Sequence, residues 1–226
     1  PISHVEAGLR SFDRTMPEEI NRLITDQISD LLFTPSADAD ENLSREGVAA
    51  EKTYLVGNVM IDTLVRLLPE APSRWKGPTL RRWTGRPYAL VTLHRPSNVD
   101  HEAEMGNIMD ALADISRDIL TIFPVHPRTR QRLPGLGTEA PDLNLVEPLS
   151  YLDFLALQRS ATLVITDSGG IQEETTFLGI PCLTLRENTE RPITATLGTN
   201  TLVGHDMDRL RSEVAGVLAG NYRKGQ

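Results

Sequence analysis

The chain has 226 residues and a formal net charge of −8, from 23 basic and 31 acidic side chains. Hydrophobic residues make up 39% and charged residues 24%, a composition that supports one large or two modest packed domains and argues against global disorder. General binding to nucleic acid or to an anionic membrane requires a positive surface, so the acidic balance argues against both. A ligand that carries phosphate must therefore be held locally, by a few arginines or by the start of a helix.

The sequence contains no pattern typical of a membrane-spanning helix, a signal segment or a metal site. No apolar stretch approaches the roughly 20 residues of a membrane-spanning helix, and no basic and then apolar signal segment is present. We therefore expect a cytoplasmic protein that does not enter a membrane. The lone cysteine, Cys182, lies in the apolar run IPCLTL and is expected to be a buried thiol rather than a reactive nucleophile. Together with five histidines it shows no metal-ligand spacing, so we expect neither a metal nor another cofactor.

Short apolar runs alternate with longer amphipathic segments along the chain. The runs are typical of strands buried on both faces and span residues 30–35, 52–57, 88–93, 119–125, 143–148, 162–167 and 181–185. Helices are predicted between them, at about residues 18–31, 36–46, 58–68, 101–117, 150–159, 170–179 and 206–219. Strands that alternate with helices form parallel sheets, so the sequence predicts a doubly wound α/β fold.

The sharpest change in composition is the proline-containing stretch LLPEAPSRWKGP, residues 67–78. It precedes a new set of strand–helix units, and the predicted helix at 58–68 leads into that set. We therefore place a domain boundary near Gly57 to Met60, with residues 1–57 ending a first domain and residues 58–226 forming a second. The chain begins without Met and is at once dense in polar residues, so we expect it to be the later part of a longer protein.

The segment TDSGGIQEE, residues 166–174, follows a predicted buried strand and opens a helix. In a doubly wound sheet, ligands bind beyond the carboxyl ends of the strands. Gly169 and Gly170 allow a sharp turn and close approach of a ligand, while the helix start and the Ser168 hydroxyl favour an anion. Glu173 or Glu174 would repel phosphate but suits neutral hydroxyls, such as the diol of a ribose. The alternative is a capped helix whose acids match the helix dipole.

The segment LVTLHRPSN, residues 90–98, also ends a predicted strand with polar side chains. Pro96 disfavours helix at the residue before it, so His94 and Arg95 are expected in a loop at the edge of the sheet. Such a pair can neutralise a pyrophosphate, or it can be incidental charge on a surface loop. A third segment, FPVHPRTRQRL, carries His126 among prolines and arginines and forms either a second anionic contact or, as we favour, a solvated helix face.

The first residues hold a further cluster of acids and arginines, in HVEAGLRSFDRTMPEEINR. Pro17 followed by Glu18 and Glu19 is a good helix start, which accounts for both acids structurally. Glu6 lies in the weakly structured stretch HVEAG and has no such explanation. A carboxylate in a cleft that faces a nucleotide is a candidate general acid or base.

Taken together and in order, these motifs closely resemble the non-hydrolysing UDP-N-acetylglucosamine 2-epimerases. The matching segments are HVEAGLRS (4–11), PEEINRLITD (17–26), VGNVMID (56–62), LVTLHRPSN (90–98), PVHPRT (124–129), TDSGGIQEE (166–174), RENTERP (186–192) and TLGTNTLVG (196–204). Each motif alone is weak evidence, but the ordered set covers almost the whole chain and is highly specific.

The resemblance implies a GT-B-like α/β fold with two Rossmann-type, doubly wound parallel-sheet domains and a UDP-sugar between them. Residues 1–57 would be the C-terminal part of the first domain, and residues 58–226 the second, UDP-binding domain. The implied reaction is reversible epimerisation of UDP-N-acetylglucosamine at C2, giving UDP-N-acetylmannosamine for cell-envelope polysaccharide. In this family UDP is eliminated to give a 2-acetamidoglucal intermediate and is then added back. A homodimer is implied for the full-length form.

The resemblance also implies roles for individual residues. Glu6 and Glu18 match the sugar-side carboxylates, and His94 matches the histidine that assists the departing UDP. His126 is the position where we expect any regulation by substrate. The residues implied to contact UDP are Arg22, His94, Phe154, Ser168, Gly169, Gly170, Glu174 and Arg191. Within that set, the serine and glycines match the phosphate contacts, Glu174 the ribose and Phe154 the uracil.

The sequence also departs from the family pattern. Family members begin with a strand and a glycine-containing loop that bring a basic residue and a further catalytic aspartate, and they end with a helix that packs back on the first domain. Because neither region occurs in this sequence, we do not expect these 226 residues alone to turn over substrate. Three alternatives stay open: a GT-B glycosyltransferase, a non-catalytic UDP-sugar-binding module, and a hydrolysing relative that releases free N-acetylmannosamine.

Overall fold

The computed structural model describes residues 1–125, 127–130, 133 and 140–225. The chain divides into two compact units, and each is described by itself. Unit 1 comprises Pro1–Thr63 and Asn188–Pro192, and unit 2 comprises Leu64–Glu187 and Ile193–Gln226. The helix α3 (Val59–Leu67) contains the first point at which the chain passes from one unit to the other.

Unit 1 is built on a three-stranded parallel sheet with the order β1-β2-β3. Its strands and helices are β1 (Ser3–Val5), α1 (Pro17–Ile28), β2 (Leu31–Thr34), α2 (Ala37–Arg45), a 3-10 turn (Ala50–Lys52) and β3 (Thr53–Leu55). A small core of Ala7, Leu32 and Leu43 joins the sheet to α2. Gly8 has a φ of +79°, and a Cβ there would lie 2.4 Å from the backbone oxygen of Ala39. The close approach of this loop to α2 therefore requires glycine.

Unit 2 contains a six-stranded parallel sheet with the order β6-β5-β4-β7-β8-β9. The strands are β4 (Tyr88–Thr92), β5 (Leu120–Pro124), β6 (Leu143–Val146), β7 (Leu163–Thr166), β8 (Cys182–Thr184) and β9 (Asn200–Leu202). The chain first builds outward from β4 through β5 to β6, and then returns to the other side of β4 with β7. The carboxyl ends of β4 and β7 therefore form the topological switch point, where doubly wound sheets bind ligands.

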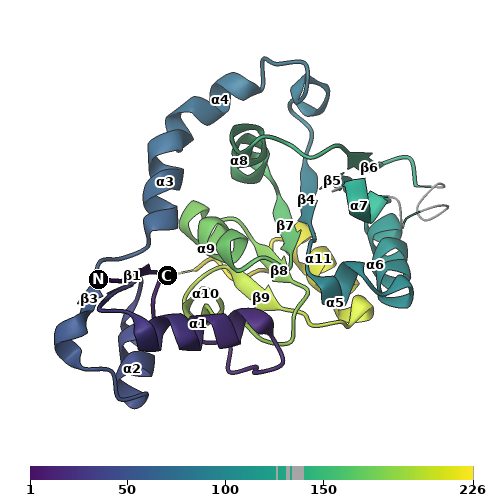
Figure 1. Cartoon of the computed structure of the whole chain (residues 1–226). Coiled ribbons are helices and arrows are strands. Elements are labelled where there is room, and N and C mark those ends of the chain that lie inside the picture. Colours follow the sequence, from purple (N-terminus) through teal and green to yellow (C-terminus); the bar gives the residue numbers. More distant parts are fainter. Residues whose placement is uncertain (126, 131–132, 134–139, 226) are drawn as a thin grey trace. The chain divides into compact units, whose positions relative to one another are not determined.

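Helices cover both faces of this sheet (Figure 1). They are α4 (Ala71–Arg74), α5 (Pro96–Val99), α6 (Glu102–Ile115), α7 (Pro127–Arg130), α8 (Tyr151–Ser160), α9 (Gly169–Leu178), α10 (Pro192–Thr196) and α11 (Met207–Leu218), with 3-10 turns at Leu68–Glu70 and Arg81–Trp83. Ala89 and Val91 of β4 pack on the core beneath α6 and α11, whereas Tyr88 and Leu90 pack on the core beneath α8. Both faces are buried, which explains why the central strands read as unbroken apolar runs.

The predicted doubly wound α/β fold is confirmed, and the buried thiol of Cys182 is confirmed as well. Burial raises the pKa of that thiol to about 11. Two strands, β1 and β9, were not predicted, because their sequences SHV and NTL contain polar residues and form no apolar run. The first long helix ends at Ile28 and not at 31, since the chain must enter β2 at Leu31.

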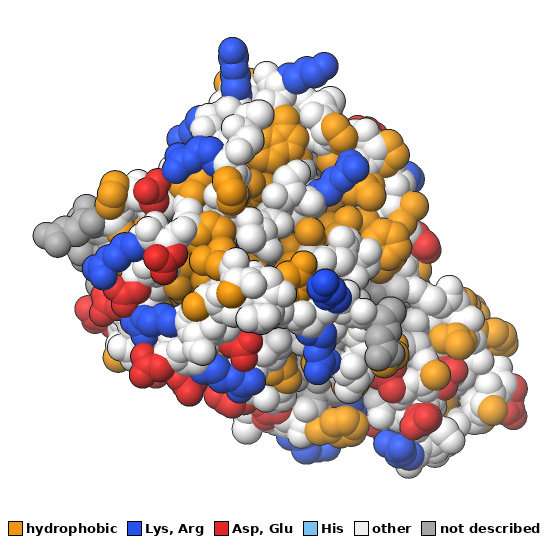
Figure 2. All heavy atoms as spheres, turned by 180° about the vertical axis from the view of Figure 1, so that it is seen from behind, with side chains coloured by type: hydrophobic (Ala, Val, Ile, Leu, Met, Phe, Trp, Pro, Cys, Tyr) orange, Lys and Arg blue, Asp and Glu red, His pale blue; other side chains and the backbone are white. Residues whose placement is uncertain are grey.

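Charged side chains of both signs lie close together on the face drawn in Figure 2, with apolar side chains between them. Ion pairs among the described residues include Arg74 with Asp153 at 2.7 Å and Arg211 with Asp114 at 3.0 Å. Within the described residues, none of the helices combines the length and the apolar character needed to cross a bilayer.

Candidate functional site

A buried carboxylate joins the loops that follow β4 and β7 at the switch point of unit 2. Asp167 comes directly after β7 and is fully buried. Its carboxylate accepts hydrogen bonds from the backbone amides of His94 (3.1 Å) and Arg95 (2.9 Å) and from the side-chain amide of Asn98 (3.0 Å). Asn98 also donates to the backbone oxygen of Leu185, after β8. One carboxylate therefore fixes the loop that carries His94 and Arg95.

The same carboxylate holds the His94 ring, with Nδ1 lying 3.0 Å from Asp167 Oδ1. This hydrogen bond raises the pKa of His94 above its ordinary value. Burial alone would raise the pKa of Asp167, but its hydrogen bonds, first among them that from His94, lower it. The His94 side chain is nevertheless 61% exposed. Because Asp167 engages Nδ1, the opposite ring nitrogen faces away from the carboxylate, and a protonated ring can present positive charge to a ligand.

The loop after β7 leads directly into α9. Ser168 is the N-cap residue, and among the described residues its hydroxyl makes no capping hydrogen bond to the helix. Gly169 and Gly170 form the first turn of α9, and a Cβ at Gly170 would come no closer than 4.0 Å to the Ser168 oxygen. Positive φ values occur at other glycines, including Gly179 at the end of α9, so the glycines do not serve to reverse the chain here. Their lack of side chains means that no Cβ stands between the helix start and an approaching anion, although Gly169 itself is buried.

Of the two adjacent glutamates in α9, Glu174 is buried, 3% exposed, and Glu173 is half-buried. Glu174 Oε1 accepts a hydrogen bond of 2.9 Å from the hydroxyl of Tyr151, at the start of α8. Burial raises the pKa of Glu174, and the Tyr151 hydrogen bond lowers it in part. Ser150 caps α8 by accepting a hydrogen bond from the amide of Asp153.

Phe154 lies one turn after Tyr151 on α8, on the same side of the helix. Its ring is half-buried and packs against the core cluster beneath α8. Phe154 therefore lies at the edge of this core with part of its ring exposed, one helical turn from Tyr151, which donates to Glu174.

In unit 1, Glu6 follows β1 with a φ of 67°, a left-handed conformation that is unusual for a residue other than glycine. Such strain persists where the surrounding structure imposes it, and it is often found at functional positions. Glu6 is half-buried, and its Oε1 lies 3.3 Å from the guanidinium of Arg191. Although the sequence suggested a weakly structured segment, His4 and Val5 before it belong to β1.

The acids at the start of α1 separate into two roles. Glu19 is buried and accepts hydrogen bonds from the amides of Ser11 and Phe12 and from Arg22, at 2.9–3.0 Å. It therefore holds the preceding loop, beyond the dipole role predicted for a first-turn acid. Glu18 is exposed. Arg22 also lies 3.8 Å from Glu190.

Unit 1 therefore brings Glu6 together with Arg191, and Arg22 together with Glu19 and Glu190. In unit 2, Asp167 and Tyr151 contact the predicted residues His94 and Glu174 but were not themselves predicted as site residues. His126 lies outside the described residues.

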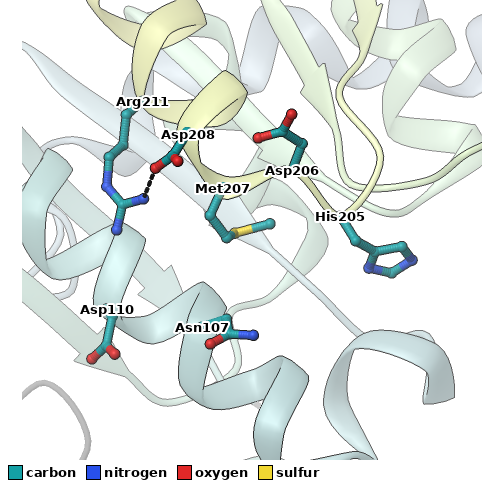
Figure 3. A pocket seen from close by; sticks show the side chains of 7 residues that line it. All are labelled: Asn107, Asp110, His205, Asp206, Met207, Asp208 and Arg211. Carbon is teal, nitrogen blue, oxygen red and sulfur yellow. Dashed lines mark hydrogen bonds and ion pairs between the residues drawn. The ribbon is translucent and has the colours of Figure 1, made fainter.

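A separate pocket in unit 2 has a volume of about 340 Å³ and lies between α6 and α11 (Figure 3). Asn107 and Asp110 line it from α6, and Arg211 lines it from α11, where it pairs with Asp208. No group of three or more His, Cys, Asp or Glu side chains in the described part of the chain is arranged to hold a metal ion.

The fold and the site define a class of protein. A doubly wound parallel sheet with a glycine-containing helix start at its switch point is typical of Rossmann-type nucleotide-binding proteins. The family model described as UDP-N-acetylglucosamine 2-epimerase matches residues 1–226, and the chain belongs to this family.

Known relatives agree with this assignment. The chain is 43% identical over 221 residues to the UDP-N-acetylglucosamine 2-epimerase of Methanocaldococcus jannaschii, covering 92% of this chain and 60% of that protein. It is 40% identical to the UDP-2,3-diacetamido-2,3-dideoxy-D-glucuronate 2-epimerase of Pseudomonas aeruginosa, covering 93% of this chain and 58% of that one. The chain therefore spans about three fifths of the length of these relatives.

The solved structure of the M. jannaschii enzyme in complex with UDP-GlcNAc and UDP is similar to this chain. The TM-score is 0.87 at 42% sequence identity, and the match covers 99% of this chain and 64% of that structure. The expected GT-B-like α/β class is thereby confirmed.

Proposed function

We propose that this chain takes part in the reversible C2 epimerisation of UDP-N-acetylglucosamine to UDP-N-acetylmannosamine. In the proposed route, UDP is eliminated across C1–C2 to leave 2-acetamidoglucal and is then added back with the opposite configuration at C2. The observation that carries the proposal is the switch point of unit 2, where Asp167, two residues before the start of α9, holds an exposed histidine. Family membership supports the same reaction.

We propose that the UDP phosphates lie at the start of α9. Ser168 would donate its hydroxyl to a phosphate oxygen, and the backbone amides of Gly169 and Gly170 would donate beside it, where the helix dipole favours negative charge. Glu174 would accept from the ribose hydroxyls, since a carboxylate suits a neutral diol and repels phosphate. Phe154 would lie against the uracil, and its half-buried ring has surface to spare for that contact.

We propose that His94 assists the departure of UDP. Elimination breaks the C1–O bond, the electron pair leaves with the β-phosphate, and the C2 proton passes to a base. Positive charge beside the leaving diphosphate lowers the energy of that step. The hydrogen bond that the His94 ring donates to Asp167 raises the pKa of His94 and so increases the cationic fraction of the ring near neutral pH.

Glu6 and Glu18 are the proposed carboxylates on the sugar side. Inversion at C2 requires that the proton be removed from one face of the sugar and returned to the other, which two acid–base groups can do. Arg191 pairs with Glu6, its guanidinium lying 3.3 Å from Glu6 Oε1, and so fixes the direction of this carboxylate. Arg22 and Arg191 are proposed to contact UDP as well.

A related substrate is the competing candidate. The P. aeruginosa relative is named as a 2-epimerase of UDP-2,3-diacetamido-2,3-dideoxy-D-glucuronate, and the chain is almost as similar to it as to the UDP-N-acetylglucosamine enzymes. Both activities invert C2 of a UDP-linked 2-acetamido sugar. The two candidate substrates would therefore use the same nucleotide site, and they differ in the groups on C3 and C6 of the sugar.

The test measures exchange of the proton at C2 of the sugar. Because the chain spans 60% of the M. jannaschii relative, the turnover assay joins it to the part of that relative it does not cover. Incubation with UDP-N-acetylglucosamine in D₂O should place deuterium at C2 and yield the manno product, both visible by NMR. Intact substrate with UDP binding preserved would contradict epimerisation and leave a glycosyltransferase or a binding module. Free N-acetylmannosamine would indicate a hydrolysing enzyme.

A further inference from the structure

The two oxygens of the Glu174 carboxylate differ in their hydrogen bonding, because the hydroxyl of Tyr151 donates to one of them. Oε1 accepts the hydrogen bond from Tyr151 at 2.9 Å. Oε2 is buried and, among the described residues, has no hydrogen-bond partner. A buried carboxylate oxygen without a donor is costly, and a hydroxyl brought by a ligand is one group that can satisfy it.

The other phenol on this side of the sheet has a different environment. Tyr88 is 1% exposed and donates to the backbone oxygen of Leu157 at 2.6 Å, a contact between a strand and a helix that is purely structural. Tyr151 is 39% exposed and donates to a side-chain carboxylate. Its capping neighbour Ser150 satisfies the helix start independently, so α8 does not need the Tyr151 hydroxyl in order to form.

A second polar side chain of α8 lies near the same carboxylate. The amide of Gln158 favours the ionised form of Glu174, although it makes no hydrogen bond of ordinary geometry within the described residues. Tyr151 is therefore the group that sets the direction of the carboxylate, because it is the one whose hydrogen bond has normal length and geometry.

We propose that Tyr151 is a positioning residue for nucleotide specificity: by holding Glu174 Oε1, it presents Oε2 to a ribose hydroxyl and so selects a ribonucleoside diphosphate over its deoxy forms. This inference rests on the proposed function, which places the ribose of UDP on Glu174. The inference adds a residue that does not itself touch the sugar. Its loss should weaken the binding of UDP and leave the binding of the deoxy form unchanged.

The experiment measures, by calorimetry, how tightly the 226-residue chain binds UDP, 2′-deoxy-UDP and 3′-deoxy-UDP. The parent should bind UDP about tenfold more tightly than the deoxy form that lacks the contacted hydroxyl. Tyr151→Phe should reduce that ratio to about twofold or less while leaving the affinity for the same deoxy form unchanged, since the lost interaction is the one the deoxy form cannot make. The control is Tyr222→Phe, because Tyr222 is also 39% exposed and belongs to the same unit.

Two results would overturn the inference alone. Tyr151→Phe with full discrimination would show that the carboxylate needs no positioning, and an equal loss for UDP and the deoxy forms would show a packing role only. A third result would also contradict the proposed function. If the parent does not bind UDP, or if Glu174→Gln discriminates as the parent does, the proposed placement of the ribose is wrong and the inference falls with it.

Discussion

Each unit contains a fully buried aspartate that holds a histidine ring, but the two pairs are built differently. Asp26 in unit 1 binds His4 Nδ1 at 2.5 Å, and Asp167 in unit 2 binds His94 Nδ1 at 3.0 Å. Asp26 also contacts Arg10 directly, at 2.7 Å, and the guanidinium of Arg10 is itself buried. The charge of Asp26 is thus neutralised inside unit 1.

The difference in exposure follows from this arrangement. The His4 side chain is 20% exposed, whereas that of His94 is 61% exposed. Arg95 donates to the backbone oxygen of Asp167, so the acid shares its charge chiefly with amides and with the His94 ring. A buried acid paired with a buried arginine stabilises the fold, while a buried acid paired with an exposed histidine leaves a ring that can present positive charge to a ligand.

The largest expected effect comes from removing the charge in unit 1. Asp26→Asn would remove one of the two carboxylates that pair with the buried Arg10, the other being Glu46 at the same 2.7 Å, and would also remove the charge beside His4. Because contacts to charged groups are lost while Arg10 keeps one counter-charge, we expect a cost of about 3 kcal/mol of unfolding free energy. Urea denaturation measures this, with Asp62→Asn, an exposed acid of the same unit, as the control. UDP binding by the folded fraction should not change. If the unfolding free energy did not change, Asp26 would not be needed for the stability of unit 1.

Asp167→Asn should have a smaller effect on stability and a larger one on ligand binding. Asn can still accept from one backbone amide, so we expect a cost of about 2 kcal/mol. The pKa of His94 should fall towards its ordinary value, as NMR titration of the ring can show, and UDP should bind more weakly. Asp118→Asn, an exposed acid in unit 2, is the matched control. A His94 pKa that does not move would contradict the role given to Asp167.

The smallest expected effect is that of pH. The pKa of His94 is raised in the folded state, so its contribution to stability is fully present below its unfolded value of about 6.5 and is lost as pH rises through the folded pKa. The pKa of Asp167 is lowered, so its contribution is lost only as pH falls below its unfolded value and through its folded one. UDP affinity should decline over the alkaline side of this window and be flatter in His94→Gln. An equally steep decline in that variant would assign the titration to another group.

Much of the fold follows from the sequence because burial on both faces of a sheet leaves continuous apolar runs, as in β4 and β7. The order of the strands about β4 was not predicted, because doubly wound sheets occur with more than one strand order. Likewise, the left-handed backbone at Glu6 depends on contacts that no local pattern records.

The site was predictable where a motif is local and not where it is assembled from distant parts. Ser168, Gly169, Gly170 and Glu174 lie within one short segment, and their types already suggest a nucleotide. Asp167 stands in that same segment, yet its function depends on a loop 72 residues earlier in the chain. Tyr151 reads as an ordinary first-turn residue of a helix until Glu174 is placed beside it, 23 residues later.

The segment Asn188–Pro192 has a practical consequence for dissecting the protein. It belongs to unit 1, although the chain on either side belongs to unit 2, so unit 1 is not one continuous stretch of polypeptide. Truncation after Thr63 would keep the three strands but remove Arg191 and Glu190, the partners of Glu6 and Arg22. A recombinant version of unit 1 therefore needs this segment joined back to residues 1–63. In a fragment without it, Glu6 would lack its partner Arg191, and its measured properties would differ from those in the whole chain.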